Sequence, residues 1–306
     1  MRSLPLACLA VALCALAPAA AAADKPRARA LGIPFDGKPG AGNAITDVTA
    51  VTVGYSTVIA GSGKNAVRSG VTAILPRGRE SVEAPVFAGV FSLNGNGEMT
   101  GTHWIEESGF LEGPVLITGT HSVGVVRDAV IAWRVKQRKP DATGYWWSLP
   151  VIAETWDGEL SDANGFHIRP EHAFAALESA ASGPIAEGNV GGGTAMTCHE
   201  FKCGTGTSSR VVEIDGKRYL LGTLVQANYG VRSELRIAGV PVGKFMPVEK
   251  KESQDQGSII VVIATDAPLL PQQLKRLARR ASLGLARNGS YSGDGSGDIF
   301  IAFSTA

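Results

Sequence analysis

Residues 249–265 read EKKESQDQGSIIVVIAT, and the charged first part changes at Gly257 and Ser258 into an unbroken apolar run. This run predicts a strand that is buried on both faces. Gly257 tolerates the unusual dihedrals of a strained turn, so the Ser258 hydroxyl can attack the carbonyl group that precedes it. The product would be an ester and then a cleaved chain, whose freed α-amine, with a pKa of about 8, can act as general base. The alternative is an ordinary loop that leads into a strand.

Further strand-like and helix-like stretches flank this run. Strands rich in Val, Ile, Leu and Thr are predicted at 48–60, 84–93, 114–119, 210–214, 219–226 and 298–304. Asp215 and Gly216 separate two of them and predict a hairpin turn. Helices are expected at 123–136, 172–181 and 271–287. The pattern favours the α/β class, with packed sheets and helices outside them.

The composition is that of a folded, exported protein. The chain has 306 residues, of which 44% are hydrophobic and 19% charged, so it can bury a substantial core. Residues 1–23 combine one Arg, a Leu, Val and Ala run and small residues, the pattern of a cleaved secretory signal. We expect residues 24–306 to form a single domain, periplasmic or secreted. Removal of the signal takes away Arg2, which leaves 28 Lys and Arg against 28 Asp and Glu. A formally neutral chain favours neither nucleic acid nor membrane as partner.

Common cofactor and metal motifs are incomplete. Residues 61–65, GSGKN, lack the first glycine and the final Ser or Thr of a phosphate loop, and no Gly-x-Ser-x-Gly turn is present. Cys198, His199 and Cys203 form only a weak metal pattern, because structural zinc needs a fourth ligand, so we expect no metal and no cofactor. The two cysteines either form a small-loop disulfide or remain partly buried thiols. The basic face of 271–287 is either a polyanion groove or an ordinary solvated surface.

Several ordered blocks together resemble the self-processing serine aminopeptidases of the DmpA and BapA type, known as L-aminopeptidase/D-esterases and β-peptidyl aminopeptidases. The resemblance extends from about residue 28 to the last residue. The blocks are RARALGIPFDGKPGAGNAITDV (27–48), LNGNGEMTG (93–101), THSVG (120–124), VIAETWDGELSDANGFHI (151–168), GNVGGGTAMTCHEFKCGTGTSSR (188–210), LVQANYG (224–230), GSIIVVIATDAPLLPQQLKRLARRASLGLAR (257–287) and GSGDIFIAFST (295–305).

This resemblance implies a four-layer αββα sandwich, similar in architecture to N-terminal nucleophile hydrolases but with different connectivity. It implies cleavage between Gly257 and Ser258 into residues 24–257 and 258–306, with Ser258 as nucleophile and its new amine as base. Ser296 and Asp298 match a Ser-x-acid pair beside that amine, although Asp298 is shorter than the Glu that is common there. Their expected role is to orient the amine and to stabilise its ammonium form.

The resemblance also implies how the substrate is held. Asn228 matches an amide that stabilises the oxyanion, and its alternative is a turn residue before a glycine. Glu154 matches an acid that pairs with the free amino group of the substrate, and its alternative is an exposed acid at a strand end. Trp156 either lines the pocket or belongs to the core.

We therefore expect an autoproteolytic serine aminopeptidase and esterase that releases N-terminal residues from short peptides, amides and esters. The resemblance implies a homo-oligomer, a tetramer of processed protomers. One alternative is an acyltransferase similar to the ornithine acetyltransferases, which use Thr as nucleophile, and the other is an inactive peptide-binding protein. Family members continue beyond the AFST strand, so we expect a C-terminally truncated chain with one exposed sheet face. Preference for L-, D- or β-amino acids depends on pocket shape and stays open.

Overall fold

A computed structural model describes residues 26–137, 147–246 and 257–306. The predicted signal at 1–23 and the charged residues 249–256 lie outside the described residues. The chain divides into two units, residues 1–35 and residues 36–306. In the first unit the described residues form a turn, in which Arg29 Nη2 donates a hydrogen bond of 3.0 Å to the carbonyl oxygen of Phe35. All elements described below belong to the second unit.

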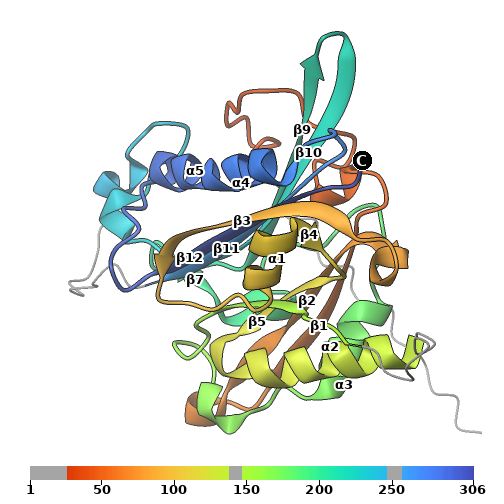
Figure 1. The fold of residues 1–306 in the computed structure, drawn as a ribbon. Coiled ribbons are helices and arrows are strands. Elements are labelled where there is room, and N and C mark those ends of the chain that lie inside the picture. Colours follow the sequence, from red (N-terminus) through yellow and green to blue (C-terminus); the bar gives the residue numbers. More distant parts are fainter. Residues whose placement is uncertain (1–25, 138–146, 247–256) are drawn as a thin grey trace, which may run out of the picture. The chain divides into compact units, whose positions relative to one another are not determined.

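Two β-sheets form the centre of this unit (Figure 1). The four-stranded sheet consists, in spatial order, of β1 (Thr52–Ala60), β2 (Val67–Arg79), β5 (Val115–Gly119) and β6 (Val151–Thr155). The six-stranded sheet consists of β4 (Phe110–Leu111), β3 (Val86–Gly95), β12 (Gly297–Ser304), β11 (Ser258–Thr265), β10 (Lys217–Asn228) and β9 (Thr205–Ile214). A hairpin of β7 (Thr197–Cys198) and β8 (Phe201–Lys202) forms a separate ribbon.

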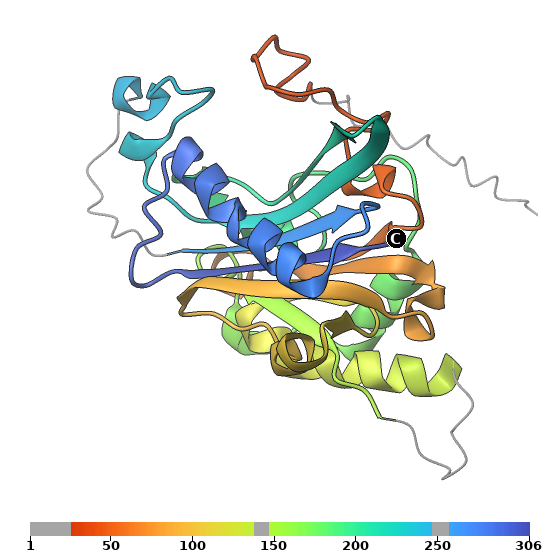
Figure 2. The same cartoon turned by 45° about the horizontal axis from the view of Figure 1, so that its top comes forward.

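Helices cover the outer faces of the two main sheets, as the two views of the ribbon show (Figures 1 and 2). The α-helices are α1 (Thr102–Ser108), α2 (Val123–Gln137), α3 (Pro170–Glu178), α4 (Pro271–Arg279) and α5 (Ala281–Asn288). Short 3-10 helices lie at Ile45–Asp47, Gly63–Asn65, Glu80–Val82, Thr120–Ser122, Ala163–Gly165, Gly191–Ala195, Arg232–Glu234 and Val242–Phe245.

Three apolar layers hold this arrangement together. Side chains of both sheets, such as Ile117 and Ile260, form the central layer. A second layer joins the four-stranded sheet to α2 and α3, and a third joins β11 and β12 to α4 and α5. The residues of β11 alternate between the central and the third layer, and all eight are buried. The observed order of layers, α-β-β-α, confirms the predicted fold class.

Several predicted elements agree closely with the structure. The strand at 258–265 has the predicted bounds, and those at 84–93, 114–119, 219–226 and 298–304 differ by two residues or fewer at each end. Asp215 and Gly216 both have positive φ, 49° and 73°, and connect β9 to β10 as predicted. The helix at 123–136 is α2, and the helix at 172–181 is α3, which begins and ends earlier.

Other predicted elements differ from the structure for physical reasons. The strand expected at 48–60 begins only at Thr52, because a 3-10 helix precedes it and Ala50 has a φ of 72°. The strand at 210–214 begins five residues earlier, at Thr205. The helix expected at 271–287 is two helices, because Arg280, with φ −71° and ψ −16°, donates its N–H to Leu277 in a 3-10 turn.

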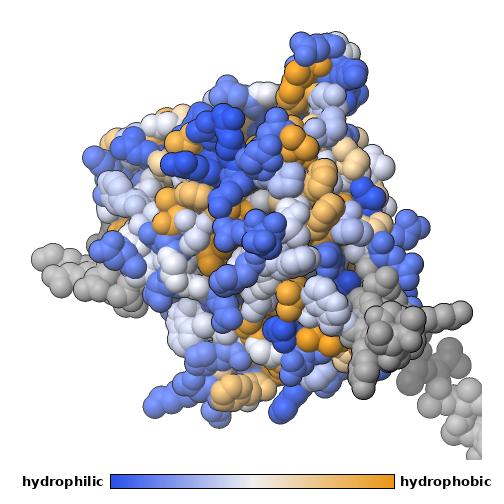
Figure 3. All heavy atoms as spheres, viewed as in Figure 1, coloured by the Kyte–Doolittle hydropathy of each residue, from blue (hydrophilic) through white to orange (hydrophobic). Residues whose placement is uncertain are grey.

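The surface over α4 and α5 is mostly hydrophilic in Figure 3. Two of the basic side chains on this face have partners in the structure. Lys275 Nζ is 2.9 Å from Glu106 Oε1, and the Arg279 guanidinium lies 5.5 Å from the centre of the Phe91 ring. These contacts favour the solvated surface over the polyanion groove. Among the described helices, none is both long enough and apolar enough to cross a membrane.

Candidate active site

A cavity of about 620 Å³ opens beside the start of β11. We call it the Ser258 cavity. Of the residues predicted to be functional, Gly257, Ser258, Asn228, Glu154 and Trp156 all line it. The described residues that line it are Gly95, Asn96, Gly97, Glu98, Thr120, Glu154, Trp156, Glu159, Thr197, Glu200, Asn228, Tyr229, Gly230, Gly257, Ser258 and Gly295. Residues that are far apart in the sequence therefore meet in one cavity.

The strand register places Ser258 opposite Asn228. Ser258 is the first residue of β11, and its antiparallel partner is the last residue of β10. Directly paired residues project to the same face of a sheet, here the face that also bears Ile260. Both side chains therefore project toward the layer between the two sheets, where the cavity opens. Ser258 is 5% and Asn228 8% exposed, so both side chains lie in a largely desolvated place.

The amide of Asn228 is fixed by two hydrogen bonds. Its Nδ2 donates to the carbonyl oxygen of Trp156 over 3.0 Å, and its Oδ1 accepts from the backbone N–H of Thr197 over 2.9 Å. An amide nitrogen carries two hydrogens, so one donor can serve a ligand in the cavity. The geometry therefore suits an oxyanion donor, and the alternative of a turn residue is wrong because Asn228 ends a strand.

Gly257 occupies a position that only glycine fits. A Cβ atom there would lie 2.4 Å from the carbonyl oxygen of Asn228 and 2.6 Å from the Cα of Tyr229. The carbonyl oxygen of Gly257 accepts a hydrogen bond of 3.0 Å from the N–H of Gly297. A donor at this oxygen would stabilise the charge that develops there when a hydroxyl attacks the carbonyl carbon.

Asp298 lies on the neighbouring strand β12 and Ser296 directly precedes that strand, and neither is among the described residues that line the cavity. β12 runs parallel to β11, with Gly297 beside Ser258, so the two residues flank the partner of the serine. Because side chains alternate along a strand, the Asp298 side chain projects away from the face of Gly297. It lies on the helix-covered face of the sheet, which also bears Phe300. Ser296 Oγ donates a hydrogen bond of 2.6 Å to Asp298 Oδ1, so the two side chains are joined as a pair. Both side chains are buried.

Glu154 is a buried acid at the end of β6. It is 3% exposed, so the alternative of an exposed acid is wrong. Its carboxylate accepts hydrogen bonds from the Thr120 hydroxyl and, over 3.0 Å, from the backbone N–H of Glu98. Burial raises the pKa of Glu154, the two hydrogen bonds lower it, and the charges of Glu98 and Asp157 raise it further. The site thus holds a carboxylate that would gain from a cationic partner.

Trp156 lines the cavity with 43% of its surface exposed, so the alternative of a core position is wrong. Its ring makes an edge contact with the ring of His121, with 5.4 Å between the centroids. The His121 ring in turn stacks on Phe166, at 6.2 Å. These rings form an aromatic rim beside the cavity.

Sequence reasoning assigned no role to the other residues of the lining. Five of them with polar or charged side chains are Thr120, Glu98, Glu159, Glu200 and Tyr229. All five stand in blocks that carry the resemblance, so a signal existed. Burial raises the pKa of Tyr229 to about 12, and the nearby charge of Asp298 adds to this effect. Among the described residues of the lining, four are Glu and none is Lys, Arg or His.

Cys198 and Cys203 are joined by a disulfide, with their Cα atoms 5.4 Å apart. Neither sulfur is therefore a thiolate, which removes two ligands of the weak metal pattern. His199 Nδ1 lies 3.1 Å from the carbonyl oxygen of Val231. Within the described ranges, no three His, Cys, Asp or Glu side chains are grouped so that they could hold a metal ion.

Comparisons with known proteins agree with this fold and site. The model of peptidase family S58 matches residues 43–306. The chain is 58% identical over 308 residues to the beta-peptidyl aminopeptidase BapA of Sphingosinicella microcystinivorans, covering 94% of this chain and 76% of that protein. It is 49% identical over 299 residues to BapA of Sphingosinicella xenopeptidilytica, covering 92% of this chain and 74% of that protein.

Two solved structures are also similar. One is the L-aminopeptidase D-Ala-esterase/amidase from Ochrobactrum anthropi, which is described as a prototype of the serine aminopeptidases and as a new variant among the Ntn hydrolase fold. It superposes with a TM-score of 0.87 at 54% identity, covering 92% of this chain and 79% of that chain. A beta-aminopeptidase from Burkholderia sp. superposes with a TM-score of 0.84 at 51% identity, covering 91% and 77% of the two chains.

A layered αββα fold with a serine at the start of a central strand defines a hydrolase of the N-terminal nucleophile type. The chain belongs to peptidase family S58. It is a serine aminopeptidase, and the comparisons favour neither the acyltransferase nor the inactive binding protein.

Proposed function

We propose that the chain cuts itself between Gly257 and Ser258 and then acts as an aminopeptidase through the new N-terminus. In the first step Ser258 Oγ bonds to the carbonyl carbon of Gly257, the C–N bond breaks, and the proton moves to the nitrogen. Water then hydrolyses the ester, which releases the Gly257 carboxylate and leaves Ser258 with a free hydroxyl beside its new α-amine. The Gly297 N–H on the Gly257 carbonyl oxygen supports this step, because it stabilises the developing charge.

The same serine serves the second reaction. Its Oγ attacks the substrate carbonyl while the α-amine takes the proton and passes it to the leaving amine or alcohol. The remaining amide hydrogen of Asn228 stabilises the oxyanion, and water hydrolyses the acyl-enzyme. Ser296 and Asp298 hold the ammonium form from the neighbouring strand. The observation that carries this function is the direct pairing of Ser258 with Asn228 at one wall of the cavity.

Glu154 selects substrates with a free N-terminus. A short peptide, amide or ester places its ammonium group against this carboxylate and its first carbonyl at Ser258. The relatives are described as beta-peptidyl aminopeptidases and as an L-aminopeptidase D-Ala-esterase/amidase, so β-amino acids and small L- and D-residues are the substrate classes to profile. Trp156 contacts the substrate at the rim.

Intact-mass spectrometry of purified protein tests the proposal. Wild type should give one fragment that ends at Gly257 and one that begins with SIIVV, whereas Ser258→Ala should remain one chain. Ser282→Ala removes a hydroxyl from α5 and serves as matched control, which should process and turn over normally. A wild-type chain that stays whole, or a Ser258→Ala chain that is cut at this bond, would contradict the proposal.

Two further expectations concern the protein in its cell. We propose export directed by residues 1–23, which is supported by their composition, and fractionation of cells that express the chain with and without these residues tests it. We also propose a homo-oligomer of processed protomers, supported by the family resemblance. Light scattering of the processed protein distinguishes a tetramer from a monomer.

A further inference from the structure

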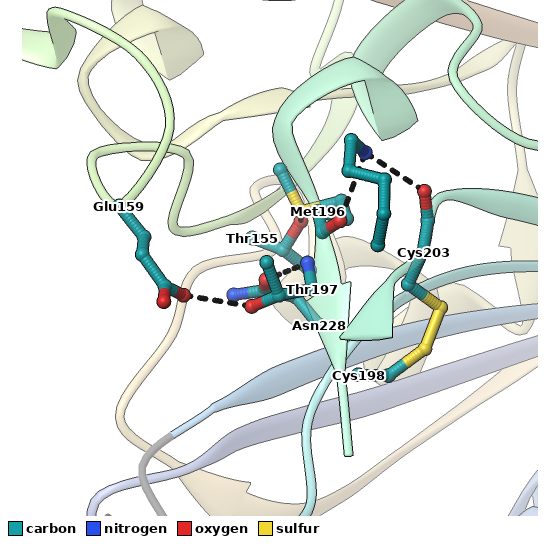
Figure 4. Close-up of a disulfide and its surroundings, with 8 residues drawn as sticks. Thr155, Glu159, Met196, Thr197, Cys198, Cys203 and Asn228 are labelled. Atoms are coloured by element: carbon teal, nitrogen blue, oxygen red, sulfur yellow. Dashed lines mark hydrogen bonds between the residues drawn. A yellow bond between two sulfur atoms is a disulfide. The ribbon is translucent and has the colours of Figure 1, made fainter. Parts of the chain in front are cut away.

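A hairpin beside the Ser258 cavity is closed by the Cys198–Cys203 disulfide (Figure 4). β7 pairs with β8 so that Cys198 lies opposite Phe201, which leaves a two-residue turn. One residue of this turn, Glu200, and the residue before Cys198, Thr197, both line the cavity. Any movement of the hairpin would therefore change the cavity wall.

The turn of this hairpin is conformationally unfavourable. Its two residues, His199 and Glu200, have φ values of 49° and 62°. Two-residue hairpins of this kind suit Asn and Gly, and each other residue with such a φ costs about 1–2 kcal/mol. The His199 N–H donates to the Tyr229 carbonyl oxygen over 2.8 Å, and the Cys203 N–H donates to that of Met196 over 2.8 Å. The disulfide adds a covalent connection across the same turn.

The hairpin also determines which way the amide of Asn228 points. The Thr197 N–H donates to Asn228 Oδ1, as the dashed line in Figure 4 shows. An amide is nearly symmetric in shape, so its orientation depends on its hydrogen bonds. If the hairpin moved, the amide could turn and present its oxygen where a donor is required. An acceptor at that place would repel the oxyanion.

We propose that the Cys198–Cys203 disulfide positions the oxyanion donor. The disulfide holds the strained turn, the turn holds Thr197, and Thr197 holds the Asn228 amide in its donating orientation. The inference rests on the proposed role of Asn228 in the reaction. Both cysteines are only half-buried, so a reducing agent can reach the bond in the folded, processed enzyme.

The experiment compares processed wild-type enzyme before reduction with dithiothreitol, after it, and after reoxidation. Titration of two new thiols confirms reduction. The concentration of active sites is measured as the amount of serine that reacts with a fluorophosphonate, and kcat is calculated from this concentration, so that unfolded protein does not lower it. An oxyanion donor acts on the transition state, and losing one costs roughly 100- to 1,000-fold in kcat. Because other hydrogen bonds persist, we expect kcat to fall about tenfold, KM to change less than twofold, and reoxidation to restore kcat.

Two variants control this test. Cys198→Ser/Cys203→Ser should have the low kcat of the reduced enzyme and should not respond to dithiothreitol. Asn228→Ala separates the two hypotheses, because an unchanged kcat in this variant would overturn the oxyanion role itself. If Asn228→Ala is impaired while reduced wild type with two free thiols keeps its kcat, only the role of the disulfide is overturned. A reduced enzyme whose KM rises while its kcat stays unchanged would also contradict the proposal.

Discussion

Glu154 carries its carboxylate in a place from which water is nearly excluded. Its two donors, the Thr120 hydroxyl and the Glu98 N–H, compensate part of the lost hydration. The Thr120 hydroxyl can also rotate and accept a hydrogen bond, whereas the N–H cannot. A Gln at this position can therefore satisfy both groups, and Glu154→Gln removes the charge with little other change.

Glu154→Gln should raise KM for substrates with a free amino group. A hydrogen bond between charged groups contributes about 1.5–3 kcal/mol, so KM for an aminoacyl p-nitroanilide should rise about 10- to 100-fold while kcat changes less. Glu98→Gln neutralises an exposed acid of the same cavity and is the matched control. Steady-state kinetics of both variants decide the matter, and an equal rise in KM for the two would remove the special role of Glu154.

The same substitution should stabilise the protein, in a pH-dependent way. Burial raises the pKa of Glu154 above 4.5, so the folded protein keeps this proton over a range in which the unfolded chain has released it. The free energy of unfolding therefore falls as pH rises through that range. The advantage of Glu154→Gln should be smallest at pH 4 and largest above the folded pKa. Urea unfolding in a Ser258→Ala background, from pH 4 to 8, tests this, and a pH-independent difference would contradict it.

At the scale of elements, the loop after β3 contacts the start of β12 through two glycines. A Cβ on Gly297 would lie 2.5 Å from the Asn96 carbonyl oxygen and 2.7 Å from the Cα of Gly97. A Cβ on Gly97 would lie 3.1 Å from Glu154 Oε1. This close backbone contact places the Glu98 N–H against Glu154, so the shape of the cavity depends on small residues in two distant elements.

Gly297→Ala should destabilise the protein and disturb the cavity together. Forcing a methyl group against backbone atoms costs about 1–3 kcal/mol, and the displaced loop should raise KM for aminoacyl p-nitroanilides several-fold. Gly284→Ala is the control, because this glycine lies in α5 with nothing near its absent Cβ. The Gly284→Ala substitution should raise the free energy of unfolding by about 0.5–1 kcal/mol and leave the kinetics unchanged. Urea unfolding and kinetics measure both, and a Gly297→Ala enzyme as stable as wild type would contradict this reasoning.

The sequence predicted those elements whose local pattern agrees with their environment. The apolar run of β11 was placed correctly because it is buried on both faces. β2 was missed because Gly70 and Pro76 interrupt its pattern. In the structure Pro76 follows the last residue paired with β1, so its absent N–H costs no ladder hydrogen bond, and Gly70 avoids contact with the carbonyl oxygens of Ser56 and Gly191. The short β6 was also missed, although it carries Glu154.

At the scale of the whole molecule, the resemblance proposed the site residues, but not how they meet. The pairing of Ser258 with Asn228 follows from strand register, which no local pattern specifies. The N–H groups of Thr197, Glu98 and Gly297 were not predicted, because every residue type offers the same backbone donor. Their importance becomes visible only when the sheets and loops are assembled.

Self-cleavage should therefore report on the folding of the whole sandwich. Phe303 in β12 is completely buried in the layer between the sheets, and replacing such a side chain with Ala costs about 3–5 kcal/mol. We expect the Phe303→Ala chain to cut its Gly257–Ser258 bond several-fold more slowly than wild type. In a Ser258→Ala background, which stays uncut, the same substitution should lower the free energy of unfolding by this amount. Phe245→Ala, at a side chain that is 78% exposed, should leave both unchanged. Time courses of intact mass measure the cleavage, and normal cleavage in a destabilised Phe303→Ala chain would show that local sequence alone drives it.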